Sequence, residues 1–261
     1  MKRLVHAMPE IFNDRLVSNV KIEEGALDEH RAKLEKYAPL YFGTKFAAKI
    51  TEAADNTLWL SGDINRTTYK GCAGLKRLSI HRTPSPDDVL VKWAVYDPRK
   101  FQSADFVQIY CHELYHITNK QMFIGPDGRV VKKTGFGITY STGLESSLGL
   151  EEGIARDFDL FVREQIEPGF EWSVKPGFGQ HMALATVREI RKNRPDVHSQ
   201  LLSAAFSKSI EDYASEYDKL LSLDPGFLKF EAAFDMRFLE MGRALHEKEM
   251  NERNETQGVD K

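Results

Sequence analysis

Two histidines one helical turn apart give this chain its clearest chemical signal. Residues 112–116 read His-Glu-Leu-Tyr-His. On an α-helix, residues i and i+4 lie on one face, so His112 and His116 can hold one metal ion. Neutral imidazoles suit zinc at about 2.0–2.1 Å. Glu113 lies about 100° further around the helix, where its carboxylate can act as general base toward a water activated by the metal.

A catalytic zinc ion needs a third protein ligand and keeps one position open for water. Residues 150–155 read Leu-Glu-Glu-Gly-Ile-Ala and lie in a second predicted helix. This segment offers Glu151 and Glu152, and Glu145 is a further acid a few residues before it. The residue types and their spacing leave these three acids open as the third ligand.

The combination of these two segments resembles the gluzincin clan of zinc metallopeptidases, in which a downstream helix carries a glutamate as third ligand. In the aminopeptidase branch that glutamate is followed by Gly-x-Ala, and here Glu152 is followed by Gly153-Ile154-Ala155. The resemblance therefore implies Glu152 as the third ligand and one Zn2+ per chain. It also implies that Asp159, seven residues later on the same helix face, orients a ligand histidine.

The resemblance and the position of Glu113 predict an enzyme, a zinc metallopeptidase that hydrolyses peptide bonds with Glu113 as general base. Tyr140 and His181 are candidates to stabilise the oxyanion, because a phenol or an imidazolium donates to developing negative charge. The Gly-x-Met-Glu-Asn motif of the aminopeptidase branch is absent, so endopeptidase and exopeptidase action both stay open. The expected partner is a peptide or protein substrate, paired as an added strand with a sheet edge within residues 75–96.

A different class of function is a catalytically idle, metal-stabilised module that binds a protein partner. Its binding surface would be the helical C-terminal third of the chain. Glu113 separates the two classes, because a structural zinc site needs no base beside its ligands. Such a site is also usually closed by four protein groups.

The elements that must position these residues follow from the period of the apolar residues. Helices are expected at about 26–38, 44–54, 103–120, 147–167, 179–193, 196–208, 210–222 and 226–250. Extended segments are expected at 56–61, 75–82, 89–96 and 135–140, and a hairpin at 122–133 around Gly-Pro-Asp-Gly. The prediction is an α+β, zincin-like fold. A small sheet lobe with the zinc-binding helix covers 1–147, a helical lobe covers 148–250, and a polar tail covers 251–261.

Composition limits the other functions. The chain has 261 residues, 41% of them hydrophobic, which is enough to bury a core and argues against a disordered or fibrous protein. Its formal net charge of −3 gives no electrostatic case for nucleic acid or an anionic membrane. Residues 1–12 contain no apolar run before Pro9, so we expect no signal peptide. The resulting expectation is a cytoplasmic protein whose oligomeric state is open.

Overall fold

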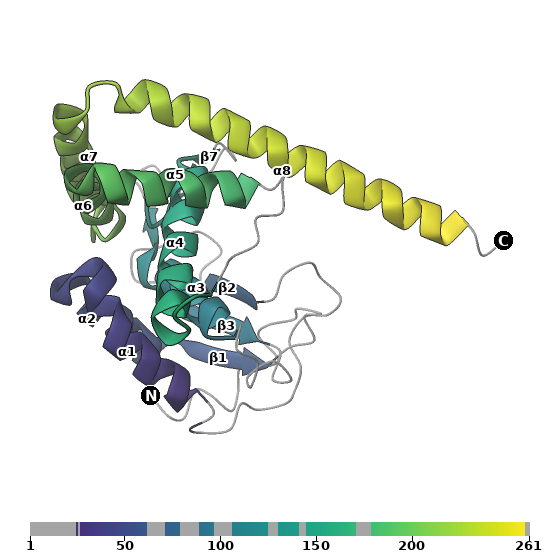
Figure 1. The fold of residues 1–261 in the computed structure, drawn as a ribbon, viewed down its shortest axis with the longest axis horizontal. Helices are drawn as coiled ribbons and strands as arrows, with labels where there is room; N and C mark the ends of the chain where they lie inside the picture. Colours follow the sequence, from purple (N-terminus) through teal and green to yellow (C-terminus); the bar gives the residue numbers. More distant parts are fainter. Residues whose placement is uncertain are drawn as a thin grey trace.

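The structure is a computed structural model that describes residues 25, 27–61, 71–78, 89–96, 106–124, 130–140, 145–170 and 179–258. Within these residues, all strands come before residue 147, and the chain after it is helical. The α+β prediction is therefore confirmed. Figure 1 shows β1, β2 and β3 with the helices α1 and α2 in the lower part of the view, and α5, α7 and α8 above them.

The first two described helices are α1 (Asp28–Phe42) and α2 (Thr44–Asn56), which pack against each other. The prediction that α1 ends before Pro39 is wrong, because the helix passes through this proline. Proline removes one backbone hydrogen bond from a helix interior. Here the next turn is held by packing, since the ring of Phe42 lies 4.5 Å from that of Phe158. The helix ends instead at Gly43, whose φ of 77° few other residues adopt.

Three strands form one small sheet, as predicted, and the structure shows their order to be β1-β3-β2. They are β1 (Leu58–Ser61), β2 (Gly71–Leu78) and β3 (Val89–Tyr96). The central strand β3 runs parallel to β1 and antiparallel to β2. The sequence placed the second strand at 75–82, but β2 begins at Gly71 because it pairs with β3 along its whole length. Residues 79–82 of that prediction lie outside the described residues.

The helix with the two histidines, α3 (Phe106–Asn119), leads directly into a second sheet. Its strands are β4 (Lys120–Ile124), β5 (Val130–Thr134), β6 (Gly137–Tyr140) and β7 (Glu145–Ser146), and each pairs antiparallel with the next. The predicted hairpin is confirmed as β4 and β5. This meander returns the chain to the start of the helix that carries the predicted third ligand.

The rest of the described chain consists of helices. They are α4 (Leu148–Ile166), α5 (Gly179–Asn193), α6 (Pro195–Ala205), α7 (Ile210–Leu223) and α8 (Phe227–Gly258). Part of the expected polar tail at 251–261 is helical instead, because residues 251–257 contain no glycine or proline and α8 runs on to Gly258. Its C-terminal half projects past the other described elements (Figure 1). No described helix is both long and apolar enough to cross a membrane.

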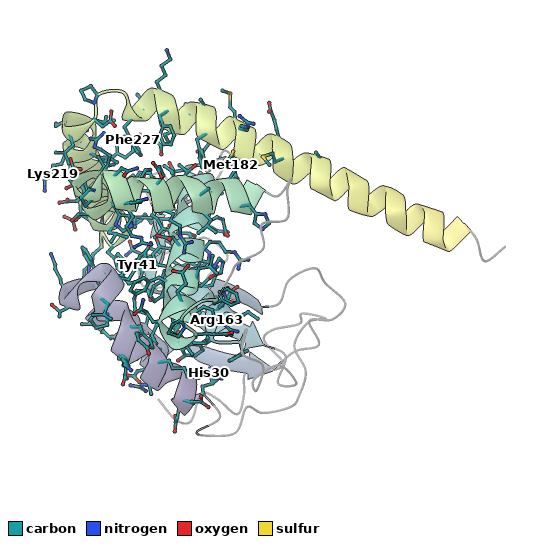
Figure 2. The ribbon with its side chains drawn as sticks, viewed as in Figure 1. His30, Tyr41, Arg163, Met182, Lys219 and Phe227 are labelled. Atoms are coloured by element: carbon teal, nitrogen blue, oxygen red, sulfur yellow. The ribbon has the colours of Figure 1, made fainter. Side chains whose placement is uncertain are left out.

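Helices α3 and α4 form the centre of the molecule, and both are buried on most sides. One buried apolar cluster includes Leu114 of α3, Ile154 of α4, Leu201 of α6 and Phe234 of α8. Figure 2 shows side chains filling the space between α8 and α5, and again between these helices and α1. The core is thus continuous across the expected boundary at residue 147, and α3 and α4 meet inside it.

Candidate metal centre

The two histidines of α3 face each other on the side of the helix that packs on α4. The Nε2 atoms of His112 and His116 lie 3.1 Å apart, and each residue is 7% exposed. Their spacing of four residues brings the rings to one face, and the apolar residues around them bury that face. Two nitrogen lone pairs therefore converge on one point in the interior.

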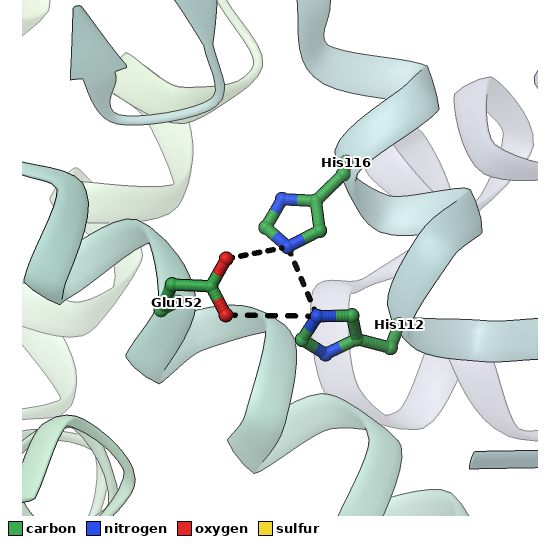
Figure 3. Close-up of side chains that lie close together, drawn as sticks. All are labelled: His112, His116 and Glu152. Carbon is green, nitrogen blue, oxygen red and sulfur yellow. Dashed lines mark hydrogen bonds and ion pairs between the residues drawn. The ribbon is translucent and has the colours of Figure 1, made fainter. Parts of the chain in front are cut away.

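Glu152 of α4 completes a group of three donors. Its Oε1 lies 3.2 Å from Nε2 of His116, and its Oε2 lies 3.6 Å from Nε2 of His112 (Figure 3). Donor atoms about 2.0–2.1 Å from a tetrahedral zinc ion are about 3.3 Å apart. One ligand atom from each of the three residues lies within 4.8 Å of the others, so the group has the size of a metal site.

The opposite nitrogen of each imidazole is held by another acid of α4. The Nδ1 of His112 lies 3.2 Å from Oδ2 of Asp159, and the Nδ1 of His116 lies 3.0 Å from Oε1 of Glu151. A carboxylate at Nδ1 places the proton there and leaves Nε2 with its lone pair free for a metal. Both histidines are thus oriented in the way that metal-binding imidazoles are.

Glu151 is itself fixed from three sides and is 2% exposed. Besides His116, its carboxylate accepts a hydrogen bond of 2.9 Å from the hydroxyl of Tyr115 and one of 2.8 Å from the backbone N–H of Phe136. The turn between β5 and β6 can come this close because residue 135 is glycine, where an added Cβ would lie 1.9 Å from the Glu151 carboxylate. Glu151 therefore holds His116 and is not free to be the third ligand.

The charges at this site favour a cation. Burial alone would lower the pKa of His116, but Glu152 and Glu151 raise it to about 10. Burial would raise the pKa of Glu152, but His116 and His112 hold it well below its ordinary value. The guanidinium of Arg156 lies 3.2 Å from Oδ2 of Asp159 and offsets part of the negative charge. Three carboxylates around two imidazoles attract positive charge, whether a proton on His116 or a metal ion.

The donor set fits zinc. Oε2 of Glu152 is buried and accepts no hydrogen bond from any described residue, so it has a lone pair without a partner. Two imidazoles and one carboxylate are the ligands that catalytic zinc takes in several hydrolases. In the described part of the chain, the group contains no fourth histidine, cysteine or acid.

Close packing of two helices explains the glycine that follows Glu152. A Cβ added at Gly153 would lie 2.6 Å from the carbonyl oxygen of Ala183 and 2.6 Å from Cγ2 of Val187, both on α5. Glycine thus lets α5 lie directly against α4. This contact fixes α4 from the side away from α3, so Gly153 contributes to the position of the neighbouring Glu152.

The remaining candidate residues have different outcomes. Glu113 of α3 is half-buried and makes no side-chain hydrogen bond or ion pair with the described residues. His181 is half-buried in the first turn of α5 and is not in the group of three donors. Tyr140 ends β6 and Glu145 begins β7, and the side chains of both lie outside the described residues.

Two contacts were absent from the sequence-based predictions. Glu151 was considered only as a rival ligand, and its contact with His116 was not foreseen. Arg156 was not expected beside Asp159. The sequence does contain a sign of the Glu151 contact. Tyr115 comes directly before His116, and Glu151 comes directly before Glu152. If His116 and Glu152 face each other, their neighbours Tyr115 and Glu151 are expected to form a second row of contacts between α3 and α4.

Comparison with known proteins adds no relative to this description. No protein-family model, no curated protein and no solved structure matches the chain.

Proposed function

We propose that this protein is a zinc-dependent metallopeptidase of the gluzincin type, with a zincin-like arrangement of α3 and α4. His112, His116 and Glu152 would hold one Zn2+. The observation that carries the proposal is the arrangement around the two histidines. Their Nε2 atoms and the Glu152 carboxylate converge, while Asp159 and Glu151 hold both Nδ1 atoms from behind. A surface pair of histidines would have no reason for this support.

Glu113 is the general base in this proposal. When bound, zinc would lower the pKa of a water molecule and polarise the scissile carbonyl. Glu113 follows the ligand His112 in α3, is half-buried, and has no described partner that would occupy its carboxylate. It would accept the proton of the attacking water and deliver it to the leaving amine nitrogen. Tyr140 and His181 stay candidates for the donor that stabilises the oxyanion.

A peptide substrate suits the sheet beside α3. Among the described strands, β2 lies at an edge of the sheet, whereas β3 is paired on both sides. β2 also contacts α3. An extended peptide could hydrogen-bond to such an edge as an added strand. The edge expected within residues 75–96 would therefore be β2, and the substrate a peptide or a protein segment. We further propose a cytoplasmic location and no nucleic-acid or membrane partner.

The alternative of a catalytically idle, metal-stabilised module predicts a different coordination. A structural zinc site is closed by four protein ligands, whereas the described group offers three. A hydroxamate binds zinc only where a position is open. It should raise the melting temperature of the zinc-loaded protein in proportion to its affinity. No shift at a saturating concentration would favour the closed site of a structural module.

The decisive experiment is Glu113→Gln, which removes the proton acceptor and keeps the size of the side chain. Zinc content and melting temperature should stay as in the wild type, while hydrolysis of a diverse peptide library falls about a hundredfold or more. Glu52→Gln on the exposed face of α2 makes the same charge change away from the site and should retain full activity. Wild-type activity in Glu113→Gln would overturn the assigned base, and absence of zinc from the wild-type protein would overturn the proposal.

A further inference from the structure

The helix that carries Glu152 does not cap its own N-terminus. Ser147 precedes α4 in a left-handed conformation, with a φ of 61°, and its side chain accepts no capping hydrogen bond from the helix. The first backbone N–H groups of an α-helix have no partner within the helix. They need acceptors from elsewhere, and at α4 the N–H of Gly149 finds one on α8.

Asp235 of α8 takes this role, and Glu231 of the same helix holds the side chain of Ser147. The carboxylate of Asp235 accepts hydrogen bonds from the backbone N–H of Ser147 and, at 3.2 Å, from that of Gly149. Glu231, one turn earlier on α8, accepts from the hydroxyl of Ser147 and from the hydroxyl of Tyr217 on α7. Acceptors with negative character at a helix N-terminus also interact favourably with the helix dipole.

Packing places α8 directly on the same turn. A Cβ added at Gly149 would lie 2.6 Å from Cε1 of Phe234 and 3.1 Å from Cγ of Phe238. Phe234 is 7% exposed and belongs to the buried apolar cluster. The start of α4 is thus held by apolar contact as well as by hydrogen bonds. Figure 1 shows α8 running above α5 and α4 at this end of the molecule.

We propose that Glu231 and Asp235 are positioning residues for the metal centre. The turn that they hold begins at Ser147, four residues before Glu151 and five before Glu152. One of these acids orients His116 and the other would bind the metal, so a shift of this turn would displace both. This inference rests on the proposed function, and it makes the C-terminal helix a required part of the metal site.

The hydrogen bonds that Asp235 accepts decide which variants test this role. Burial raises the pKa of Asp235, although the N–H groups of Ser147 and Gly149 oppose the shift. Burial also raises the pKa of Glu231, with Asp235 adding to the effect. The amide oxygen of an asparagine can accept the same two N–H hydrogen bonds as the carboxylate of Asp235. Asp235→Asn keeps such an acceptor, whereas Asp235→Ala removes it.

Two measurements test the inference, zinc affinity and amide hydrogen exchange of residues 147–152 in the metal-free protein. Asp235→Ala should raise the zinc Kd about tenfold and speed exchange in this turn. Asp235→Asn should stay within about threefold of the wild-type Kd. Tyr41→Phe, which removes a buried hydrogen bond to Asp157 in the middle of α4, is the control and should leave the Kd unchanged. If Asp235→Ala does not fold, Glu231→Ala replaces it with the same expectation.

Two outcomes would overturn the inference. In one, Asp235→Ala keeps the wild-type Kd and exchange rates. In the other, Tyr41→Phe weakens zinc binding as much as Asp235→Ala does, so that the effect reflects general destabilisation. If the wild-type protein binds no zinc, the proposed function fails. Amide hydrogen exchange alone then tests whether α8 holds the first turn of α4. Faster exchange confined to residues 147–152 in Asp235→Ala would then support the capping by α8, and unchanged exchange would refute it.

Discussion

Glu151 and Glu152 are neighbours in the chain, but their carboxylates contact different nitrogen atoms of His116. Glu151 contacts Nδ1 of His116 at 3.0 Å, and Glu152 contacts Nε2 at 3.2 Å. They differ because successive residues of a helix point about 100° apart. Glu151 is 2% exposed and surrounded by donors, whereas the side chain of Glu152 is 28% exposed and has an oxygen without a hydrogen bond. The surroundings of Glu151 suit a residue that holds His116 in place, and those of Glu152 suit a residue that coordinates a metal ion.

Neutralising these two acids separately tests that division. Glu152→Gln should weaken zinc binding more than Glu151→Gln does, since it replaces an anionic ligand by a neutral amide, whereas Glu151→Gln should weaken it by about 10–100-fold. Competition with a chromophoric chelator measures both affinities. His116→Ala sets the scale for loss of a ligand. If Glu151→Gln weakens zinc binding more than Glu152→Gln does, the ligand on α4 is Glu151 and the assignment to Glu152 is wrong.

At the scale of elements, α4 contacts α3 and α5 as well as α8, and the first two contacts position its acids in the candidate metal centre. Glu151 and Asp159 face α3, and Gly153 lies against α5. The α4–α5 contact leaves no room for a methyl group, since both the carbonyl of Ala183 and a methyl of Val187 lie within 2.6 Å of the Cβ position. Backbone cannot move aside as a flexible side chain can, so a larger residue must separate the helices.

Gly153→Ala should therefore destabilise the protein despite the higher helix propensity of alanine. We expect a loss of about 1–3 kcal/mol in the free energy of unfolding, measured by urea denaturation, and weaker zinc binding. Gly226→Ala is the matched control, because a Cβ there meets only the carboxylate of Asp224 at 3.3 Å. Equal stability of both variants would show that α4 and α5 separate without cost.

At the scale of the whole molecule, a second buried polar group joins four helices. Asp157 of α4 is fully buried and accepts from Tyr41 of α1 and from Arg188 and Arg191 of α5. His198 of α6 lies 3.4 Å from the Tyr41 hydroxyl. Burial lowers the pKa of His198 to about 4, although Asp157 opposes the shift. Asp157 thus joins the helices around the candidate metal centre, and a neutral histidine lies next to this group.

This histidine makes stability depend on pH. Its ordinary pKa of 6.5 applies to the unfolded chain, so between about pH 6.5 and pH 4 the unfolded chain binds more protons than the folded one. The contribution is fully present above pH 6.5 and is lost as the pH falls. Between pH 7.5 and 4.5 the metal-free protein should lose about 2–3 kcal/mol through this group. Urea denaturation of wild type and His198→Gln measures it, and an equal loss in both would refute it.

The sequence by itself determined the local features. Apolar periodicity predicted α3, the sheet of β1 to β3 and the β4–β5 hairpin, because helices and strands show their buried faces in the order of residues. The four-residue spacing put His112 and His116 on one face, and the resemblance carried by the residues after Glu152 predicted which acid would lie beside them. Only the tertiary structure decided that Pro39 stays inside a helix, where the packing of Phe42 outweighs one lost hydrogen bond.

The partners of the site were also decided by tertiary structure. Glu151 meets His116 across 35 residues of sequence, and Asp235 meets Ser147 across 88. No periodicity encodes such pairs, because they depend on how α3, α4 and α8 cross in space. Buried polar groups find partners wherever the fold brings them, since leaving one unpaired costs more than the hydrogen bond gains. The sequence therefore indicates which residues can bind a metal, and the packing of the helices decides which residues hold them in place.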